Sequence, residues 1–354
     1  MEILQNTIGF LEQLPQPVFL VKDQTVAYAN HAAQLRDVQK KTNIYDLISI
    51  GHQEYQHFTS GKLILTVCVS GILYNTVVTN TGDYHLFCLE SEYSKPELRA
   101  FAVAAQALRD PLSNLFLGMD KLLPDPAVKN SPALLAQIKA INRNIYQIHR
   151  AVQNMSDAAA IGSASYMETR DVVAYISEIV EKANVLLANI QHRIEFQPLN
   201  RPIYCQINPE SLKRAILNLV TNAVKYASGD GAIRISLRIG ANKLYICVQS
   251  DCEHPMALIS SNIFSAFTRE PSIGDHSRGI GLGLHITHSI AASHKGTLLV
   301  EHPDDSSLRF TLSLSTTVPD VVKVNAPVLI TDNSGGFDTF LVELADVLPP
   351  DLYE

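Results

Sequence analysis

The chain has 354 residues, of which 46% are hydrophobic and 18% are charged, and its formal net charge is -7. This apolar content excludes an intrinsically disordered chain, and the length predicts two or three packed units. The acidic balance, without any run of Lys or Arg, argues against nucleic acid as a partner.

The cysteine pattern and the N-terminus bear on the compartment. The cysteines are odd in number and have no C-x-x-C pair: Cys68, Cys88, Cys205, Cys247 and Cys252. We expect reduced core thiols. Met1 is not followed by a basic and then apolar run, and the most apolar stretch, 63–78, is broken by polar residues, so neither a signal peptide nor a transmembrane segment is predicted. The expected location is the cytoplasm.

Residues 6–93 have the pattern of a small α+β unit. Strands are expected at 17–21, 25–30, 62–69, 72–79 and 85–89, separated by turn residues. The order of a strand, a turn, a strand ending in Asn30, helices and three further strands resembles a PAS sensor domain. That resemblance implies a small-molecule signal, which the sequence does not identify.

Residues 95–163 carry two apolar stripes with alternating steps of three and four, separated by a proline-containing break. The stripes are Leu98, Phe101, Ala105, Leu108, Leu112, Leu115, Met119 and Leu122, and then Leu134, Ile138, Ile141, Ile145, Ile148, Val152, Met155 and Ala159. We predict a long antiparallel helical hairpin. One hairpin cannot bury both faces, so we expect a homodimer that pairs two hairpins in a four-helix bundle.

Residues 168–316 alternate helical and strand patterns, as an α/β sandwich does. A helix expected at 209–227 places Asn218, Asn222 and Lys225 together, away from its apolar face. The run from Asn218 to Tyr226 resembles the N box of the histidine kinase, gyrase and heat-shock chaperone ATPases. This resemblance implies ATP, with Asn222 as a ligand of Mg²⁺ and Asn218, Lys225 and Tyr226 around the nucleotide.

A glycine-rich run precedes an apolar helix expected at 286–292. Its closely spaced glycines allow backbone N–H groups and a helix N-terminus to approach a phosphate. The run resembles the G2 box of the same family, which makes Gly279, Gly281, Leu282 and Gly283 candidate nucleotide-binding residues. Between the two boxes, 263–267 resembles the F box and 268–278 the lid over the nucleotide.

The G1 box of the family does not match. The strand at 244–248 should lead into Asp-x-Gly-x-Gly, but the aligned residues are Ser250, Cys252 and His254. Loss of a buried charge-assisted hydrogen bond costs roughly 1.5 to 3 kcal/mol, so we expect nucleotide affinity to fall about ten- to a hundred-fold. Asp251 is one residue away, and strand alternation aims it at the other face unless the turn differs.

The phosphoacceptor motif has also changed. Active family members carry His-Glu-x-x-x-Pro, whereas this frame begins with Gln106 and Ala107 and keeps Pro111. An amide is not a nucleophile, and a methyl group is not a base. His149 should lie at nearly the same height on the hairpin as Gln106. It follows Ile148 of the second stripe, so we expect it to point outward into solvent.

The whole chain is therefore expected to be a multidomain α+β protein that ends in an extension, 317–354, of unknown role. Its resemblance to sensor histidine kinases implies a two-component signalling protein with ATP and Mg²⁺, which acts on a response regulator or a partner kinase without autophosphorylation at the usual site. Two alternatives stay open. One is an active kinase that phosphorylates His149 or a separate protein, and the other is a non-enzymatic PAS ligand sensor and dimer scaffold.

Overall fold

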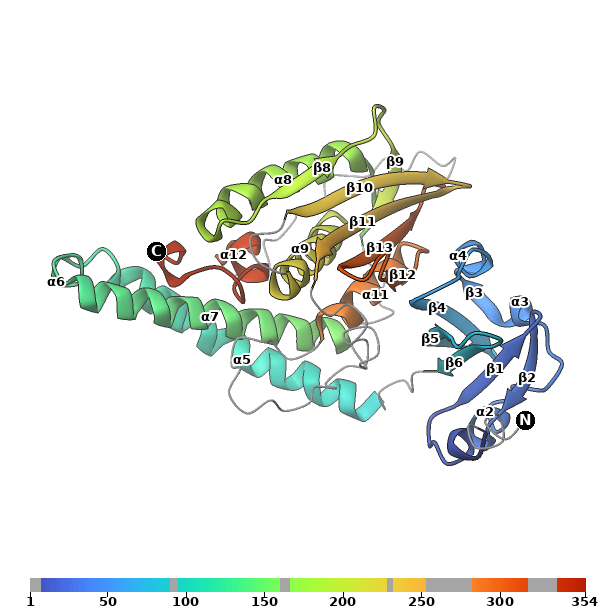
Figure 1. The fold of residues 1–354 in the computed structure, drawn as a ribbon. Coiled ribbons are helices and arrows are strands. Elements are labelled where there is room, and N and C mark those ends of the chain that lie inside the picture. The colour runs from blue at the N-terminus through green and yellow to red at the C-terminus, as the bar shows by residue number, and fades with distance from the viewer. Residues whose placement is uncertain (1–7, 90–94, 160–165, 228–231, 253–281, 318–335) are drawn as a thin grey trace.

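The computed structural model describes residues 8–89, 95–159, 166–227, 232–252, 282–317 and 336–354 (Figure 1). An N-terminal sheet unit, two long helices and a C-terminal sheet with its helices occupy different parts of the molecule. The candidates Gly279 and Gly281 and the F-box-like and lid segments lie outside the described residues.

The N-terminal unit is an antiparallel sheet with short helices on one side. Its strands are β1 (Val18–Lys22), β2 (Thr25–Ala29), β3 (Ile48–Ile50), β4 (Lys62–Val69), β5 (Ile72–Asn80) and β6 (His85–Leu89), and its helices α2 (His31–Gln34), α3 (Ile44–Leu47) and α4 (His52–Gln56). The strand order is β2-β1-β6-β5-β4, with β3 beside β4. Asn30 ends β2 because its side chain caps α2, accepting a hydrogen bond from the backbone N of Ala33 at 2.9 Å.

Two long helices, α5 (Lys95–Leu122) and α7 (Pro132–Ala159), pack along each other and are joined through α6 (Pro126–Lys129). Alternate members of the predicted stripes are buried: Ala105, Leu112, Met119, Ile138, Ile145 and Val152. The intervening members are 39–55% exposed: Leu108, Leu115, Leu122, Leu134, Ile141 and Ile148. Among the described side chains, three members of each stripe therefore pack within the chain and three face outward.

The C-terminal sheet has the strand order β8-β10-β11-β13-β12. Its strands are β8 (Ile194–Gln197), β10 (Ile233–Gly240), β11 (Lys243–Asp251), β12 (Leu298–Glu301) and β13 (Ser307–Ser315), and a separate pair is β7 (Glu168–Asp171) with β9 (Tyr204–Ile207). Along β10, Ile233, Ile235 and Leu237 are buried, while the residues between them are less so. This alternation gives the sheet one apolar face, which packs against α8 (Val172–Leu187), α9 (Pro209–Tyr226) and α11 (Gly283–Ser293). The short η1 (Ala188–Ile190) follows α8.

The two sheets are continuous, which the sequence did not indicate. Strand β4 pairs antiparallel with β12, with Ile64 opposite Leu298. Gly61 precedes this pairing with φ +81, and a Cβ on it would lie 2.1 Å from the carbonyl oxygen of Val300. Beside the joint, Glu54 of α4 accepts a hydrogen bond from the Ser313 hydroxyl at 2.6 Å. The N-terminal unit is thus attached to the edge of the C-terminal sheet by main-chain hydrogen bonds.

The C-terminal segment, 336–354, forms α12 (Thr339–Glu343) and η2 (Pro350–Leu352). It packs against both α7 and α9, so that it lies between the helical pair and the C-terminal sheet unit (Figure 1). Its apolar side chains belong to the hydrophobic core that the helical pair shares with the C-terminal sheet unit. The buried ones are Phe337, Phe340, Val342, Leu344, Ala345, Leu348 and Tyr353. The segment is therefore an integral part of the packing between these two units.

All five cysteines are free, and Cys205, Cys247 and Cys252 are buried. Burial raises the pKa of the Cys205 thiol to about 11, so this thiol is a core group rather than a reactive one. In the part of the chain that the structure describes, no helix combines the length and apolarity that a membrane crossing requires.

Candidate functional site

Helix α9 carries a polar stripe along one side. Asn208 caps its start by accepting a hydrogen bond from the backbone N of Ser211 at 2.9 Å, and Pro209 occupies the first turn. Arg214, Asn218, Thr221 and Lys225 follow at steps of four, three and four residues. At this spacing their side chains share one side of the helix, next to Asn222.

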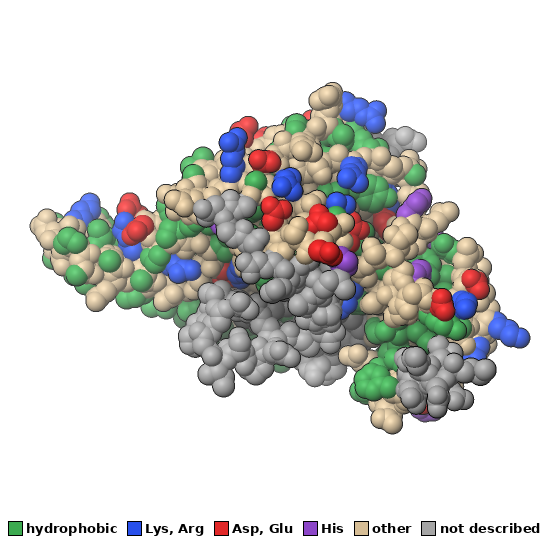
Figure 2. Space-filling view, in the orientation of Figure 1, with side chains coloured by type: hydrophobic (Ala, Val, Ile, Leu, Met, Phe, Trp, Pro, Cys, Tyr) green, Lys and Arg blue, Asp and Glu red, His purple; other side chains and the backbone are tan. Residues whose placement is uncertain are grey.

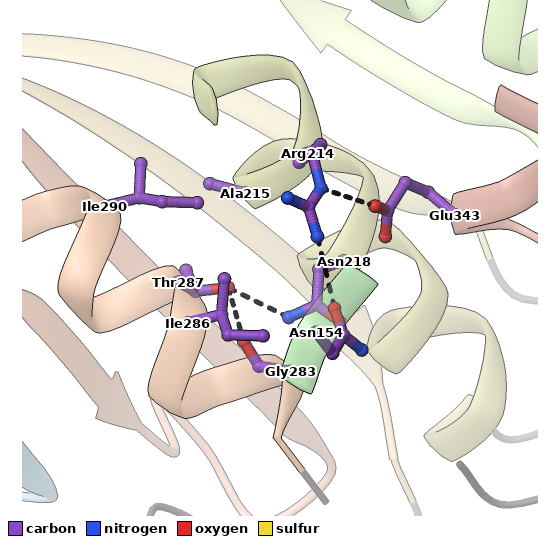
Figure 3. Close-up of a pocket in the computed structure, with 9 residues that line it drawn as sticks. All are labelled: Asn154, Arg214, Ala215, Asn218, Gly283, Ile286, Thr287, Ile290 and Glu343. Atoms are coloured by element: carbon purple, nitrogen blue, oxygen red, sulfur yellow. Dashed lines mark hydrogen bonds and ion pairs between the residues drawn. The ribbon is translucent and has the colours of Figure 1, made fainter. Parts of the chain in front are cut away.

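Asn218 joins α9 to the start of α11. Its side-chain Nδ2 donates to the hydroxyl of Thr287 at 2.8 Å, and this hydroxyl donates to the carbonyl oxygen of Gly283 at 2.9 Å (Figure 3). A Cβ on Gly283 would lie 2.4 Å from the Asn218 Oδ1 atom. The structure thus brings the asparagine predicted from the N-box-like run into contact with the last glycine of the G2-like run, and only glycine allows this approach.

A small pocket lies where α7, α9, α11 and α12 meet (Figure 3). Its lining residues are Asn154, Arg214, Ala215, Asn218, Gly283, Ile286, Thr287, Ile290 and Glu343. The guanidinium of Arg214 lies between Glu343 of α12 and Asn154 of α7, at 2.8 Å and 3.2 Å. Residues from four separate elements therefore form one polar cluster.

Buried charges from α7, α9 and the C-terminal segment form ion pairs next to this pocket. Arg150 donates to Glu343 Oε2 at 3.2 Å and to Asp346 Oδ2 at 2.7 Å. Lys225 Nζ lies 2.5 Å from the same Asp346 oxygen. The Glu343 and Asp346 side chains are 3% and 8% exposed, so the ion pairs are shielded from water. We call Arg150, Arg214, Lys225, Glu343 and Asp346 the acidic clasp.

The clasp keeps its arginine on α9 charged. Burial lowers the pKa of Arg214, but the carboxylates of Glu343 and Asp157 outweigh this and hold the pKa above its ordinary value. Thr221 adds a neutral contact, because its hydroxyl donates to the Glu343 carbonyl oxygen at 2.9 Å. Helix α12 is therefore held to α9 by both charged and neutral hydrogen bonds.

The residues predicted to face a phosphate differ in their surroundings from what the sequence indicated. Asn218 was expected to face out of the core with Asn222 and Lys225, but it is buried, and its Oδ1 accepts from Arg150 Nη2 at 3.0 Å. Lys225 is paired with Asp346. Asn222 and Tyr226 are half-buried, and Leu282 is buried. The expectation that the N-box side chains face outward together is therefore wrong for Asn218, because α7 and α11 contact its side chain.

Ser250 and Asp251, at the end of β11, point to different faces. Ser250 is 2% exposed, and within the described part of the chain its hydroxyl has no hydrogen-bond partner. Asp251 is partly exposed, with Oδ1 3.7 Å from Nη2 of Arg234. The residue that the sequence aligns with the family's carboxylate is thus a buried hydroxyl, whereas the neighbouring carboxylate of Asp251 is directed to the surface.

The helical pair places Gln106 and His149 in different environments. Gln106 is exposed on α5. His149 stacks on the ring of Phe337, with centroids 4.1 Å apart and planes 18° apart. Burial, and then the charges of Arg109 and Arg214, lower the pKa of His149 to about 4. The expectation of a solvated, outward His149 is wrong, because the C-terminal segment covers its ring.

Sequence reasoning missed Arg150, Arg214, Glu343 and Asp346. They belong to three elements far apart in the chain: Arg150 and Glu343, for example, are separated by 193 positions. A signal was present, because the 337–347 segment is largely apolar and carries three acidic residues: Asp338, Glu343 and Asp346. Its charges gain a role only when the tertiary fold brings the arginines to them.

Comparisons with known proteins show which families the chain resembles. Residues 207–318, which include α9 and α11, match the model of the histidine kinase-, DNA gyrase B-, and HSP90-like ATPase family. The chain is 27% identical over 229 residues to the adaptive-response sensory kinase SasA of Synechococcus sp. (strain JA-3-3Ab), covering 60% of this chain and 58% of that protein. The chain is similar to sensor histidine kinases.

Other relatives are more distant or much longer. The sensor protein KdpD of Escherichia coli (strain K12) is 25% identical to this chain over 253 residues. The match covers 70% of this chain and 27% of KdpD. Histidine kinase P4 of Formosa agariphila is 21% identical over 244 residues, covering 65% of this chain and 18% of that protein. The matched regions thus span between 18% and 58% of these curated relatives.

Solved histidine kinase structures also align with this chain. Full-length ShkA in complex with AMPPNP aligns with 62% of this chain and 47% of that chain, at 19% identity and a TM-score of 0.49. Histidine kinase ThkA in complex with the response regulator protein TrrA aligns with 87% of this chain and 98% of that chain, at 17% identity and a TM-score of 0.43.

Proposed function

We propose that this sensor histidine kinase homologue is a degenerate kinase that binds ATP with Mg²⁺, does not phosphorylate itself at the usual site, and signals through its conformation to a response regulator or a partner kinase. One observation supports the proposal. Asn218 of the N-box-like run contacts Gly283 of the G2-like run, as a nucleotide site would require, while the residue aligned with the phosphoacceptor is the exposed Gln106.

The side chains present suit a nucleotide and its metal. The amide oxygen of Asn222 is a hard ligand that fits Mg²⁺, and Lys225 carries the charge that a phosphate requires. The Ser250 hydroxyl is buried and has no hydrogen-bond partner among the described residues, so it offers one hydrogen bond to a base, in place of the family's carboxylate. We therefore expect ATP to bind at this site with reduced affinity. When bound, Mg²⁺ would neutralise phosphate charge.

The outward half of the helical stripes supports a homodimer. Leu108, Leu115 and Leu122 of α5 recur every seven residues, as do Leu134, Ile141 and Ile148 of α7, and all six are exposed. Hydrophobic side chains are visible on the protruding helical pair in the space-filling view (Figure 2). A second copy would cover these positions and complete a four-helix bundle.

The N-terminal unit is proposed as the signal input. Its β4 strand continues into the C-terminal sheet through β12, so a change in β4 register or twist would act directly on the ATPase sheet. We propose that a small molecule bound by this PAS-like unit shifts the balance between two arrangements of the sheet. Binding of that molecule would then alter the nucleotide site without any phosphate transfer.

The test is phosphate transfer measured beside nucleotide binding. The full-length protein, Gln106→His/Ala107→Glu and the control Asn114→His, which places a histidine two turns further along α5, are each incubated with γ-labelled ATP and Mg²⁺. We expect the wild type and the control to bind nucleotide without acquiring phosphate. The double variant regains the missing nucleophile and base, and we expect it to acquire acid-labile phosphate. Stable phosphate on the wild-type chain would overturn the proposal.

The same experiment separates the alternatives. Phosphate mapped by mass spectrometry to His149 would favour an active kinase, although stacking on Phe337 disfavours in-line attack by that ring. Phosphate on an added response regulator would favour a kinase with a separate acceptor. Absence of nucleotide binding at millimolar ATP would leave a ligand sensor and dimer scaffold.

A further inference from the structure

Two carboxylates of the C-terminal segment each bridge the helical pair and the ATPase domain. Glu343 accepts from Arg150 of α7 at 3.2 Å and from Arg214 of α9 at 2.8 Å. Asp346 accepts from the same Arg150 at 2.7 Å and from Lys225 of α9 at 2.5 Å. Each acidic group is thus held by one cation from each unit.

The rest of the segment is bound along α7 as a peptide ligand would be. The Arg143 side chain donates to the carbonyl oxygen of Ala345 at 3.1 Å, and Asn142 Nδ2 donates to that of Tyr353 at 3.2 Å. Lys139 Nζ lies 2.5 Å from the Glu354 carboxylate. The Tyr353 side chain is 1% exposed and packs edge-on against Tyr146, with centroids 5.0 Å apart. Charge, main-chain contacts and an aromatic anchor together define a specific site.

Two residues proposed to meet nucleotide phosphates take part in this arrangement. Lys225 pairs with Asp346, and Asn218 is bound by Arg150, which Glu343 and Asp346 hold in place. Like a phosphate, the Asp346 carboxylate is an anion whose oxygens accept hydrogen bonds. It therefore binds the lysine that a phosphate would need. Phosphate could contact Lys225 only after Asp346 is displaced or the lysine turns away.

We propose that the groove between α7 and α9 is a binding site for an acidic peptide, filled by the chain's own residues 336–354, which compete with nucleotide phosphates and lock the ATPase domain on the helical pair. This inference rests on the proposed nucleotide site. The segment is a tethered ligand. Nucleotide binding and movement of the ATPase domain away from α7 both require its release.

The expected change in nucleotide affinity can be derived from the equilibrium between the bound and released states of the C-terminal segment. If nucleotide binds only when the segment is released, its apparent Kd is the intrinsic Kd divided by the fraction of released molecules. Loss of the Asp346 charge removes two ion pairs, those with Arg150 and Lys225. Asp346→Asn should therefore raise the released fraction and tighten nucleotide binding by at least about tenfold.

The experiment uses the full chain throughout. A fluorescent ATP analogue with Mg²⁺ is titrated into the wild type, Asp346→Asn and the matched control Asp351→Asn. Asp351 is exposed in the same segment, and Asp351→Asn removes the same charge outside the clasp. Hydrogen exchange of residues 339–348 in the wild type, with and without the analogue, reports release of the segment independently of any substitution.

We expect tighter binding by Asp346→Asn, unchanged binding by Asp351→Asn, and faster exchange at 339–348 when nucleotide is present. Equal affinities for all three proteins, with the segment still protected, would overturn the inference and leave the nucleotide site standing. Equal tightening by both variants would also overturn it, because the effect would then come from general charge. Failure of all three to bind nucleotide at millimolar concentration would refute the nucleotide site and the inference together.

Discussion

Arg214 of α9 and Glu343 of α12 form a buried ion pair, with Arg214 Nε 2.8 Å from Glu343 Oε1. The pair ties the end of the chain to the helix that carries the N-box residues. Arg150 approaches the other oxygen of the same carboxylate. Glu343 therefore balances two guanidinium groups at the junction of the ATPase domain and the helical pair.

Removal of the Glu343 carboxylate should be strongly destabilising. Glu343→Ala leaves two buried guanidinium groups short of a partner, and the free energy of unfolding should fall by about 3 to 5 kcal/mol. The control is Glu210→Ala, which breaks an exposed pair with Lys213 on the same helix and should change that free energy by less than about 1 kcal/mol. Urea denaturation measures both. If the two substitutions lowered the free energy of unfolding by similar amounts, the Glu343 ion pairs would contribute no more to stability than an exposed pair.

The sheet joint can be tested at Gly61. Gly61→Ala forces a Cβ to within 2.1 Å of the Val300 carbonyl oxygen, so β4 and β12 cannot keep their pairing. Gly71 has nearly the same positive φ, but a Cβ on it meets nothing within 4 Å. Both substitutions cost backbone strain, about 1 kcal/mol, and only Gly61→Ala should also separate the units. Small-angle scattering should detect a larger radius of gyration for Gly61→Ala alone, and the same compact radius in both variants would argue against the joint.

A carboxylate introduced at Ser250 should change the affinity for the nucleotide. If this position reads the base, Ser250→Asp restores a charge-assisted hydrogen bond and should tighten binding of the ATP analogue about ten- to a hundred-fold. Ser250→Ala should weaken it only slightly. Without nucleotide the new carboxylate is buried and unpaired, so the melting temperature of Ser250→Asp should fall and then recover when ATP is added. No recovery, with unchanged affinity, would remove this residue from the nucleotide site.

His149 should make the protein sensitive to mild acid. Its pKa is lowered to about 4 in the folded chain, against about 6.5 in the unfolded chain, so the unfolded state takes up a proton first as the pH falls. Its contribution to stability is complete above about pH 6.5 and is lost between about pH 6.5 and pH 4. Thermal denaturation across this window should show a smaller loss for His149→Gln than for the wild type.

The control for His149 is His57→Gln, a substitution of an exposed histidine in the N-terminal unit. Other buried histidines, such as His288, remain in every variant, so the difference between variants isolates His149. His57→Gln should follow the wild-type curve. A His149→Gln curve that coincides with it would mean that Phe337 does not shield the ring.

Local pattern was enough to predict most of the elements. The strand predicted at 62–69 has the bounds of β4, and the helix predicted at 209–227 ends one residue earlier, at Tyr226. Each was read from alternation or helical spacing over a few neighbouring residues, which burial on one face enforces. The same spacing placed Asn218, Asn222 and Lys225 on one helix and predicted the two apolar stripes.

The stripe pattern could not show which of its members the chain itself would bury. Leu112 is buried and Leu115 is exposed, although both fit the heptad equally well. The direction of approach of α7 decides between them, and that direction is a property of the packed pair rather than of either helix.

The sequence by itself determined the elements, the motifs that resemble those of the ATPases and the glutamine at position 106, because these depend on residue types at short spacing. Only the tertiary structure decided that β4 joins β12, that Phe337 covers His149, and that Asp346 holds Lys225. These contacts join residues separated by more than a hundred positions. Their energies come from desolvated charges and main-chain pairing, which exist only once the units have packed together.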